Sequence, residues 1–373
     1  MNHLRFHLII LLVIVLCATH STAATDTTKM VRIEGGEFLM GATDTTDWPG
    51  ELPQHRVRIS SFYMDVTEVT NQQFADFVKA TGYITIAEQP VDWEQIKKQV
   101  PVGTPKPPDS VLQPGSLVFV QPRQMVDLNN ASHWWKWVVG ASWRHPEGPG
   151  SSIDNRMDHP VVHVTYDDAV AYAAWVGKSL PTEAEWEYAS RGGVQGARYH
   201  WGNNDASDTT PPCNIWQGQF PIQNTLADGA LRTNRVGSYA PNAFGLYDMA
   251  GNVWEWCSDK YRADAYEYPN SRIAEQSNKR EERVIPSDSE ERTFNREERV
   301  IPSDSEERIV VDPTGPSDSW DPNDAVPTTL KHVIRGGSFL CHRGYCESYR
   351  NSARRGETPD TGMSHIGFRC VRR

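Results

Sequence analysis

Apolar residues recur at helical spacing in three segments of the first half of the chain. In the first segment Phe74, Phe77 and Val78 share one face, with Thr70 before them and Gly82 after them. A threonine fits the N-cap of a helix, and a glycine beyond the last apolar position fits its stop. The pattern therefore predicts a helix between Thr70 and Gly82 with its apolar face in the core.

Two further helices follow in succession. The first spans about Asp167–Gly177, behind a capping pattern that begins at Thr165, and the second begins with a capping box at Thr182. The double glycine after Arg191 predicts the end of the second of these helices. Beyond Gly193 the pattern favours short strands and long loops.

Strand signals are shorter and broken by glycine. The run from Met30 to Met40 is rich in strand-forming residues and contains Gly35 and Gly36, which predict a turn. With 27 Gly, 25 Pro and 13 Trp in 373 residues, we expect many loops around a tryptophan-rich core and little regular structure. The expected fold class is α+β.

The first residues have the features of a secretory leader. Arg5 precedes an apolar run over Leu8–Leu16, and small residues follow at 21–24. A membrane anchor is the alternative, but the run is much shorter than the roughly 20 residues that a spanning helix needs. We expect a signal peptide at 1–24 and a single domain over 25–373 in the secretory pathway. Whether that is the endoplasmic reticulum lumen, the periplasm or the extracellular space stays open.

A polar segment is duplicated in the second half of the chain. The run R-E-E-R-V-I-P-S-D-S-E-E-R occurs at 280–292 and again at 296–308. Solenoid repeats need more units to bury a core, and this segment has little apolar surface to bury. We predict a disordered insert at about 262–329 that interrupts the domain and carries no chemistry.

The composition and the net charge argue against several classes of function. Hydrophobic residues at 38% and charged residues at 23% are typical of a globular domain. The formal net charge of −11 disfavours nucleic acid and, once the leader is removed, an anionic membrane as partners. No G-x-S-x-G elbow is present, which argues against a serine hydrolase of that type.

The candidate chemistry lies in two cysteines. Removal of the leader leaves five cysteines, an odd number, so at least one is not in an internal disulfide. Cys341 and Cys346 stand five apart, among His342 and several arginines. Nearby cations favour thiolates, and two thiolates suit monovalent copper better than zinc, which prefers four ligands. A structural disulfide between the pair is the equally weighted alternative.

This segment resembles the active-site stretch of formylglycine-generating enzymes, also called sulfatase-modifying factors. Its sequence, R-G-G-S-F-L-C-H-R-G-Y-C, begins at Arg335. Other similar segments are H-W-W-K-W-V-V-G-A-S-W-R-H-P-E-G-P (133–149), D-H-P-V-V-H-V-T-Y (158–166), L-P-T-E-A-E-W-E-Y (180–188), N-I-W-Q-G (214–218), G-L-Y-D-M-A-G-N-V-W-E-W (245–256), T-P-D (358–360) and G-F-R-C (367–370). The resemblance covers nearly all of 30–373 apart from the insert.

The resemblance implies an irregular fold related to C-type lectins and an oxidase that uses molecular oxygen. It implies Cu(I) held by Cys341 and Cys346, and a substrate cysteine within a Cys-x-Pro-x-Arg motif of unfolded or nascent sulfatase polypeptides. That cysteine would become formylglycine. Ser338 matches a family serine near the oxygen site, and His342 would lie behind the copper ligands.

The resemblance also implies two structural calcium sites. Calcium prefers hard oxygen ligands, including backbone carbonyls, in loops. The implied ligands are Asn214, Ile215, Asp228 and Ala230 for the first site, and Asp248, Gly251, Val253 and Glu255 for the second. Ordinary turn capping is the alternative explanation of these Asn and Asp residues.

The sequence departs from animal members of the family at their disulfides. Ala173, Ser190 and Asn351 occupy three of the four cysteine positions, and Cys370 occupies the fourth. Whether Cys213 or Cys257 pairs with Cys370 stays open. The competing function is a noncatalytic lectin-like module that binds calcium or a partner, and the presence of both Cys341 and Cys346 argues against it.

Overall fold

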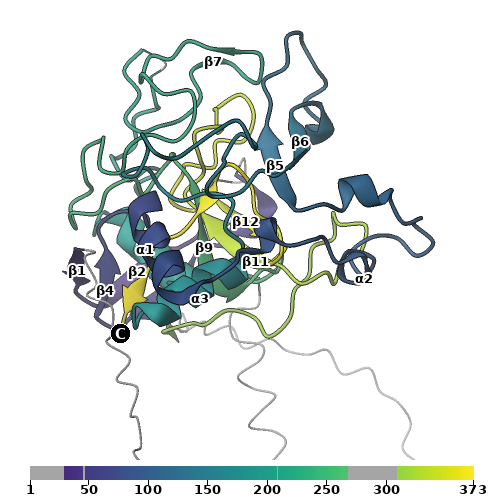
Figure 1. Cartoon of the computed structure of the whole chain (residues 1–373). Coiled ribbons are helices and arrows are strands. Elements are labelled where there is room, and N and C mark those ends of the chain that lie inside the picture. The colour runs from purple at the N-terminus through teal and green to yellow at the C-terminus, as the bar shows by residue number, and fades with distance from the viewer. Residues whose placement is uncertain (1–28, 45–46, 208, 268–308) are drawn as a thin grey trace, which may run out of the picture.

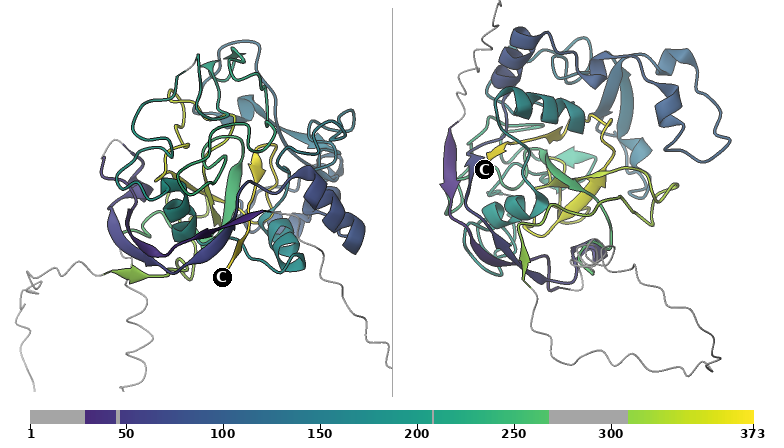
Figure 2. Two further views of the ribbon diagram at one scale, coloured as in Figure 1. Left: turned by 90° about the vertical axis from the view of Figure 1, so that its left-hand side faces the viewer. Right: turned by 90° about the horizontal axis from the view of Figure 1, so that it is seen from below.

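The computed structural model describes residues 29–44, 47–207, 209–267 and 309–373 (Figure 1). The expected leader (1–24) and the duplicated segment (280–308) lie outside these described residues. Figure 2 gives two further views, in which the β5–β6 strand pair and the short helix α2 lie toward one side of the molecule, away from β1 and β2.

All three predicted helices form with their predicted caps. Thr70, Thr165 and Thr182 each accept the backbone N–H of the third helical residue in a capping box. The helices are α1 (Asn71–Thr81), α2 (Trp93–Ile96), α3 (Tyr166–Trp175) and α4 (Glu183–Arg191), with single 3₁₀ turns at Pro49–Glu51, Ile86–Glu88, Asp109–Val111 and Ala131–His133. None of the helices in the described ranges has the length and apolar character needed to cross a bilayer.

The strands form several small sheets. The largest has the order β12 (Arg354–Glu357), β11 (His332–Arg335), β9 (Trp254–Lys260) and β13 (Ile366–Gly367). Two three-stranded sheets have the orders β1 (Met30–Ile33), β4 (Phe62–Asp65), β14 (Val371–Arg372) and β10 (Val310–Val311), β3 (His55–Ile59), β2 (Gly36–Met40). Two antiparallel pairs are β5 (Gly115–Phe119) with β6 (Trp135–Val139), and β7 (Gly218–Gln219) with β8 (Gln223–Asn224).

The glycine break inside the first strand-like run separates two sheets. β1 pairs with β4 and β2 pairs with β3, so the two halves of the run do not form a hairpin with each other. A side chain at Gly35 would place its Cβ 2.4 Å from the Ile59 carbonyl oxygen. Glycine is therefore required because the backbones approach closely where the chain passes between sheets.

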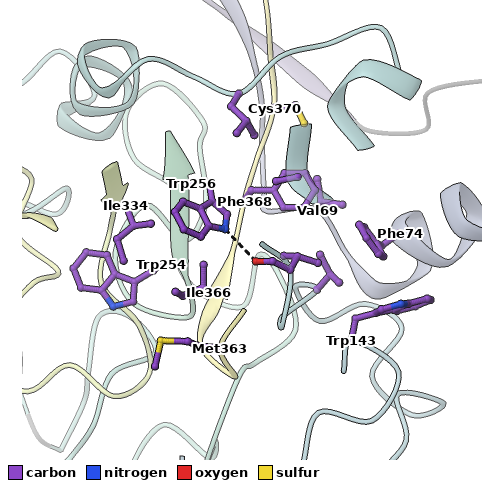
Figure 3. Packing of buried hydrophobic residues seen from close by; sticks show 14 of the residues in the cluster. Val69, Phe74, Trp143, Trp254, Trp256, Ile334, Met363, Ile366, Phe368 and Cys370 are labelled. Atoms are coloured by element: carbon purple, nitrogen blue, oxygen red, sulfur yellow. Dashed lines mark hydrogen bonds between the residues drawn. The ribbon is translucent and has the colours of Figure 1, made fainter. Parts of the chain in front are cut away.

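The main core packs α1 and α3 against the four-stranded sheet (Figure 3). Phe74 of α1 meets Trp143 edge-on at 5.2 Å between ring centroids. Trp256 of β9 is fully buried and donates its indole N–H to the Val164 carbonyl oxygen at 3.1 Å. The core is therefore rich in tryptophan, as the composition predicts, and the indole N–H of a fully buried tryptophan has a hydrogen-bond acceptor.

The flanks of the predicted insert belong to the fold, which corrects its boundaries of about 262–329. Tyr266 is buried and donates its hydroxyl to Glu183 at 3.1 Å. After the gap, Val310 is buried and β10 pairs in parallel with β3. These flanks are rich in Pro and Asp, so their composition did not indicate that a few of their apolar side chains pack into the core.

Candidate active site

A cleft of about 600 Å³ opens beside the four-stranded sheet, and it contains the three candidate catalytic residues. Ser338, Cys341 and Cys346 all line it, on the loop that follows β11. Cys341 is 2% exposed and Ser338 is fully buried, whereas Cys346 is partly exposed. The structure therefore brings together the residues that the sequence predicts, while their catalytic roles stay predictions.

Backbone hydrogen bonds fix the loop that carries the cysteines. Cys341 N–H donates to the Ser338 carbonyl at 2.9 Å, and Cys346 N–H donates to the His342 carbonyl at 3.0 Å. Gly337 has φ +71°, and a Cβ there would lie 2.9 Å from the Ser348 backbone. The glycine lets the two ends of the loop touch, so both sulfurs point into the same cleft.

The two thiols differ in acidity. Burial, together with the hydrogen bond to Cys346, raises the pKa of Cys341 well above its ordinary value. The hydrogen bond from Cys341, with a smaller contribution from the Arg355 charge, lowers the pKa of Cys346 to about 7. Cys346 is thus the more acidic thiol of the pair, and the hydrogen bond from Cys341 stabilises its thiolate form.

The arginines around the pair do not act as the sequence suggests. Arg350 directs its guanidinium to the buried Glu51, with contacts of 2.5 and 2.7 Å, and to Asp47 at 3.0 Å. Arg354 is held by Glu183 at 2.6 Å. Their charges are therefore neutralised by carboxylates rather than presented to the sulfurs, and Arg355 is the arginine that contributes to the acidity of Cys346.

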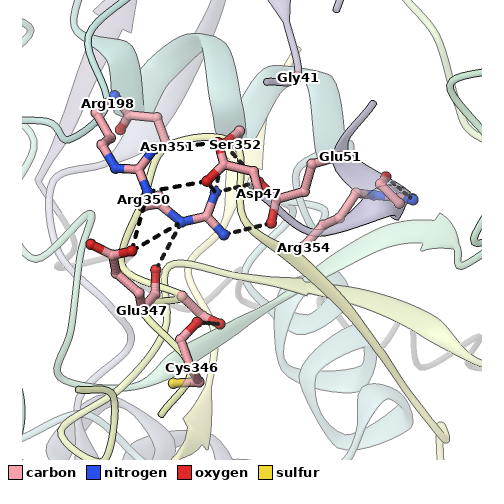
Figure 4. Close-up of polar contacts among 12 residues, drawn as sticks. Gly41, Asp47, Glu51, Arg198, Cys346, Glu347, Arg350, Asn351, Ser352 and Arg354 are labelled. Carbon is pink, nitrogen blue, oxygen red and sulfur yellow. Dashed lines mark hydrogen bonds and ion pairs between the residues drawn. The ribbon is translucent and has the colours of Figure 1, made fainter. Parts of the chain in front are cut away.

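A carboxylate–arginine network instead clamps the loop behind Cys346 (Figure 4). Arg350 donates to the carbonyl of Glu347, the residue after Cys346, at 3.2 Å. Arg198 bridges the Glu347 and Asp47 carboxylates, with both contacts at 3.1 Å. Glu347 has φ +43°, a costly backbone conformation for a residue with a side chain. The network holds that conformation and with it the position of Cys346.

The other cleft walls come from segments that are distant in the chain. Trp134, Trp135 and Trp254 lie within the family-like motifs of the sequence, where they have no predicted role, and the sequence predicts no part for Phe220 or Met363. Tyr345 stacks on Phe220 at 4.5 Å between ring centroids. The other lining residues include Trp48, Arg355, Glu357 and His365. No local sequence signal identifies them, because only the fold brings them together.

The W-R-H-P-E-G-P stretch (143–149) packs against the core and does not line the cleft. Trp143 is buried against α1, and Arg144 lies over the Trp143 ring at 4.1 Å. Glu147 forms two hydrogen bonds of 2.8 Å with Arg156. This motif therefore joins the segment after β6 to α1 and to Arg156.

The cysteine pair fits the copper ion that the resemblance implies. Two sulfurs within hydrogen-bonding reach of each other offer the soft ligands that Cu(I) prefers. Within the described ranges no cluster of three or more His, Cys, Asp or Glu side chains is placed to hold a metal. The donor set is therefore two thiol sulfurs, which does not satisfy the four-ligand preference of zinc.

The first calcium set also fits its implied ion. The side-chain oxygen of Asn214 is buried and receives no hydrogen bond within the described residues. The Gln217 amide nitrogen contacts both the Ile215 carbonyl and Asp228, so these two oxygens converge on one positively polarised group. Burial raises the pKa of Asp228, and a cation would offset that cost. Ala230 donates its N–H to Asp228 at 2.9 Å.

The second calcium set fits less well. Both oxygens of Glu255 are engaged at 2.7 Å by the Arg369 guanidinium, and one also accepts the Trp186 indole N–H. Asp248 instead interacts with Glu68, a fully buried carboxylate whose pKa is raised by burial and by the Asp248 charge. The Glu255 side chain, already neutralised, does not suit the role that the resemblance gives it. The backbone positions are Gly251 and Val253, both buried on the same loop.

No disulfide joins any of the five cysteines in the described ranges. Ser190 donates its hydroxyl to the side-chain oxygen of Asn351 at 2.8 Å, and both are positions to which the resemblance assigns cysteine in animal members. Cys213 and Cys370 both lie in the main core, whereas Cys257 lies in the core under the smaller sheets. The contact between Ser190 and Asn351 joins α4 to the loop that follows the cysteine pair.

Comparisons with known proteins agree with this geometry. The model of the sulfatase-modifying factor enzyme 1-like domain matches residues 17–373. The chain is 43% identical over 347 residues to the formylglycine-generating enzyme of Thermomonospora curvata, covering 92% of each protein. It is 41% identical over 344 residues to that of Mycobacterium tuberculosis, covering 92% of this chain and 97% of the relative.

Among solved structures, PvdO from Pseudomonas aeruginosa shares the fold. The TM-score is 0.51 at 22% identity, covering 92% of this chain and 93% of the other. The expected irregular, lectin-like α+β class is therefore confirmed. The chain belongs to the sulfatase-modifying factor enzyme 1-like family.

Proposed function

We propose that the protein is a formylglycine-generating oxidase that acts on the cysteine of a Cys-x-Pro-x-Arg motif in unfolded or nascent sulfatase polypeptides. The observation that carries the proposal is the pair of cysteine side chains, one acidic and one buried, that share a cleft open to solvent. Full-length relatives named as formylglycine-generating enzymes support it.

Cys341 and Cys346 would hold the Cu(I) ion, which supplies the chemistry that couples molecular oxygen to oxidation of a thiol. The chain's own residues prepare this site. Cys346 is the more readily ionised of the two thiols near neutral pH, and Cys341 would have to give up its proton to act as a second thiolate ligand. Ser338, beside them, would position oxygen or water through its hydroxyl.

The substrate cysteine would be converted in two stages, a two-electron oxidation followed by hydrolysis. The substrate methylene and thiol together lose two protons and two electrons to oxygen, which becomes hydrogen peroxide, and leave a carbon–sulfur double bond. Water then adds to that carbon, and hydrogen sulfide leaves, so that an aldehyde remains.

Calcium at Asn214, Ile215, Asp228 and Ala230 would be structural, as would any ion at the backbone oxygens near Asp248. We also propose that the protein works in a secretory compartment, on the basis of its leader-like first residues.

Co-expression with a sulfatase in a host that lacks this modification tests the proposal. The sulfatase peptide that carries the motif should contain an aldehyde when the wild-type protein is present. It should retain its thiol with Cys341→Ser or Cys346→Ser, whereas Cys257→Ser, a buried cysteine outside the cleft, should not prevent conversion. An unmodified peptide beside well-folded wild-type protein would favour a noncatalytic binding module.

A further inference from the structure

Three aromatic rings stack on one another behind the cysteine pair. Tyr199 and Trp201 lie nearly parallel with 4.6 Å between ring centroids. Tyr349 stacks on both, at 5.6 Å from Tyr199 and 6.2 Å from Trp201. Tyr199 and Tyr349 are nearly inaccessible, whereas Trp201 is half-buried. These three residues, here called the aromatic stack, lie outside the set that lines the cleft, so Trp201 meets solvent on another surface.

One end of the stack lies against the cysteines. The backbone N–H of Ser348, the residue before Tyr349, donates to the sulfurs of Cys341 and Cys346. Burial raises the pKa of Tyr349, with contributions from neighbouring acidic groups that include Cys341. Tyr349 and Cys341 also belong to the same core cluster. The stack therefore runs from the cysteine pair to a partly exposed tryptophan.

The middle of the stack has an acceptor for a proton. The Tyr199 hydroxyl donates to a Glu347 carboxylate oxygen at 2.7 Å, which is within reach for direct proton transfer. Arg198 holds that carboxylate in place with a contact of 3.1 Å. A phenol that loses an electron becomes a strong acid, so its proton would pass along this hydrogen bond to Glu347. Tyr199 can therefore be oxidised and restored without exchanging its proton with solvent.

We propose that the aromatic stack carries electrons from the surface to the cysteine pair when oxygen is activated there and no substrate thiol is present. This inference rests on the proposed function, because the oxidase supplies the oxidant. Tyrosine and tryptophan rings give up single electrons readily, whereas an oxidant that is not discharged attacks the thiolates and converts them to sulfenic and then sulfinic acid. The stack therefore protects the two cysteines.

The electrons and protons balance in single steps. The oxidant at the cysteine pair takes one electron from Tyr199 through Tyr349, and the Tyr199 proton moves to Glu347. Trp201 returns one electron to Tyr199, which recovers its proton from Glu347. Trp201 then takes one electron from a thiolate in solution, and two thiolates oxidised in this way join as a disulfide.

Light-driven oxidation of copper-free protein tests the path without the proposed chemistry. A ruthenium polypyridyl photo-oxidant is attached to Cys346, the half-exposed thiol, since the other four described cysteines are buried. With a sacrificial electron acceptor, illumination leaves the label one electron short, and the label then draws an electron from the protein. Mass spectrometry of the peptides compares oxidation of Trp201 with that of Trp320, a half-buried tryptophan beside Arg262 and outside the cleft.

The test variant carries Tyr199→Phe and Tyr349→Phe together, which keeps both rings and removes both oxidisable phenols. Tyr63→Phe, at an exposed tyrosine of β4, is the control. In the wild-type protein and the control, oxidation of Trp201 should exceed that of Trp320 severalfold, and in the double variant this excess should be lost. An excess retained in the double variant would overturn the inference, and so would equal oxidation of the two tryptophans in the wild-type protein. Circular dichroism checks that each protein is folded.

The copper-loaded protein gives a second readout. In oxygen, with a thiol reductant and without a substrate peptide, the double variant should convert Cys341 and Cys346 to sulfinic acid faster than the wild-type protein does. Equal rates of sulfinic acid formation would contradict the protective role.

Conversion of a Cys-x-Pro-x-Arg peptide separates this inference from the proposed function. If the wild-type protein converts the peptide but Trp201 shows no excess oxidation under light, the function stands and the electron path is wrong. If Trp201 shows the excess and the double variant loses it, but no aldehyde forms, the electron path stands and the oxidase is excluded.

Discussion

Cys341 and Cys346 show how two residues of one type acquire different chemistry within a single loop. In the sequence both stand among arginines, and the spacing gives no reason to distinguish them. In the structure Cys341 is buried and donates to Cys346, while Arg350 and Arg354 are turned to buried glutamates. The acidity of a thiol depends on which neighbours face it, which a sequence does not specify.

The first prediction concerns the ionisation of Cys346. In copper-free protein, the rate of alkylation of Cys346 should rise with pH around a midpoint near 7, because the thiolate is the nucleophile. Cys341→Ala removes the donor that stabilises the thiolate, so the midpoint should move toward the ordinary value of about 8.5. Mass spectrometry of the alkylated peptides gives both rates.

Cys257→Ser is the control for this measurement, because Cys257 is buried in another part of the core. It should leave the Cys346 midpoint unchanged. Equal midpoints in the wild-type protein and Cys341→Ala would show that the hydrogen bond between the two cysteines does not govern the acidity of Cys346.

At the scale of elements, the helices could be predicted from the sequence, but the pairing of the strands could not. Caps at Thr70, Thr165 and Thr182 act within a few residues, so the local sequence contains the whole signal. The sheets join strands from distant parts of the chain: β14 pairs with β4, and β13 pairs with β9. The cleft depends on such pairings, so its aromatic walls could not be predicted.

The second prediction concerns the clamp behind the cysteine loop. Glu51→Gln leaves the buried Arg350 guanidinium with one fewer carboxylate, so the free energy of unfolding should fall by up to about 3 kcal/mol. Arg350→Met should also destabilise the protein, because it leaves Glu51 buried without its cation. Urea unfolding of each variant measures the loss.

The double variant Glu51→Gln with Arg350→Met tests whether the two residues act as a pair. Neither charge is then left alone, so its loss of stability should be clearly smaller than the sum of the two single losses. Additive losses would mean that the two side chains stabilise the loop independently, against the network that the contacts describe.

For the whole molecule, many charges are buried in a fold with little regular structure. Arg335, Arg350, Arg354 and Arg369 are each nearly inaccessible and are each paired with a buried glutamate. These pairs connect short strands and loops to α4, to β9 and to the Pro49–Glu51 turn. Composition predicted the scarcity of regular elements, but it gave no indication that charged residues would fill the interior, since most arginines and glutamates are exposed in ordinary proteins.

The third prediction follows from a buried carboxyl group where β9 meets α4. Burial and the neighbouring Glu183 charge raise the pKa of Asp259 to about 7. In the unfolded chain this group ionises near pH 4. As pH rises from about 4 to 7, the unfolded state releases its proton first, so the contribution of Asp259 to stability falls across this window.

Asp259→Asn removes that titration while keeping an acceptor for the Glu183 backbone N–H. The difference in unfolding free energy, variant minus wild type, should therefore increase between pH 4.5 and 7.5 by about 2–4 kcal/mol. Urea unfolding at both pH values measures it, with the exposed Asp154→Asn as control. A difference that does not change with pH would mean that Asp259 is ionised in the folded protein throughout.

The most direct test of the central claim is the conversion of a Cys-x-Pro-x-Arg peptide by the purified, copper-loaded protein. Mass spectrometry should show the thiol replaced by an aldehyde in the presence of oxygen, and no change without oxygen or without copper. Cys341→Ser and Cys346→Ser should yield unmodified peptide, while Cys257→Ser converts it as the wild-type protein does. An unmodified peptide with folded, copper-loaded wild-type protein and oxygen would contradict the proposal, and so would undiminished conversion by either cleft variant.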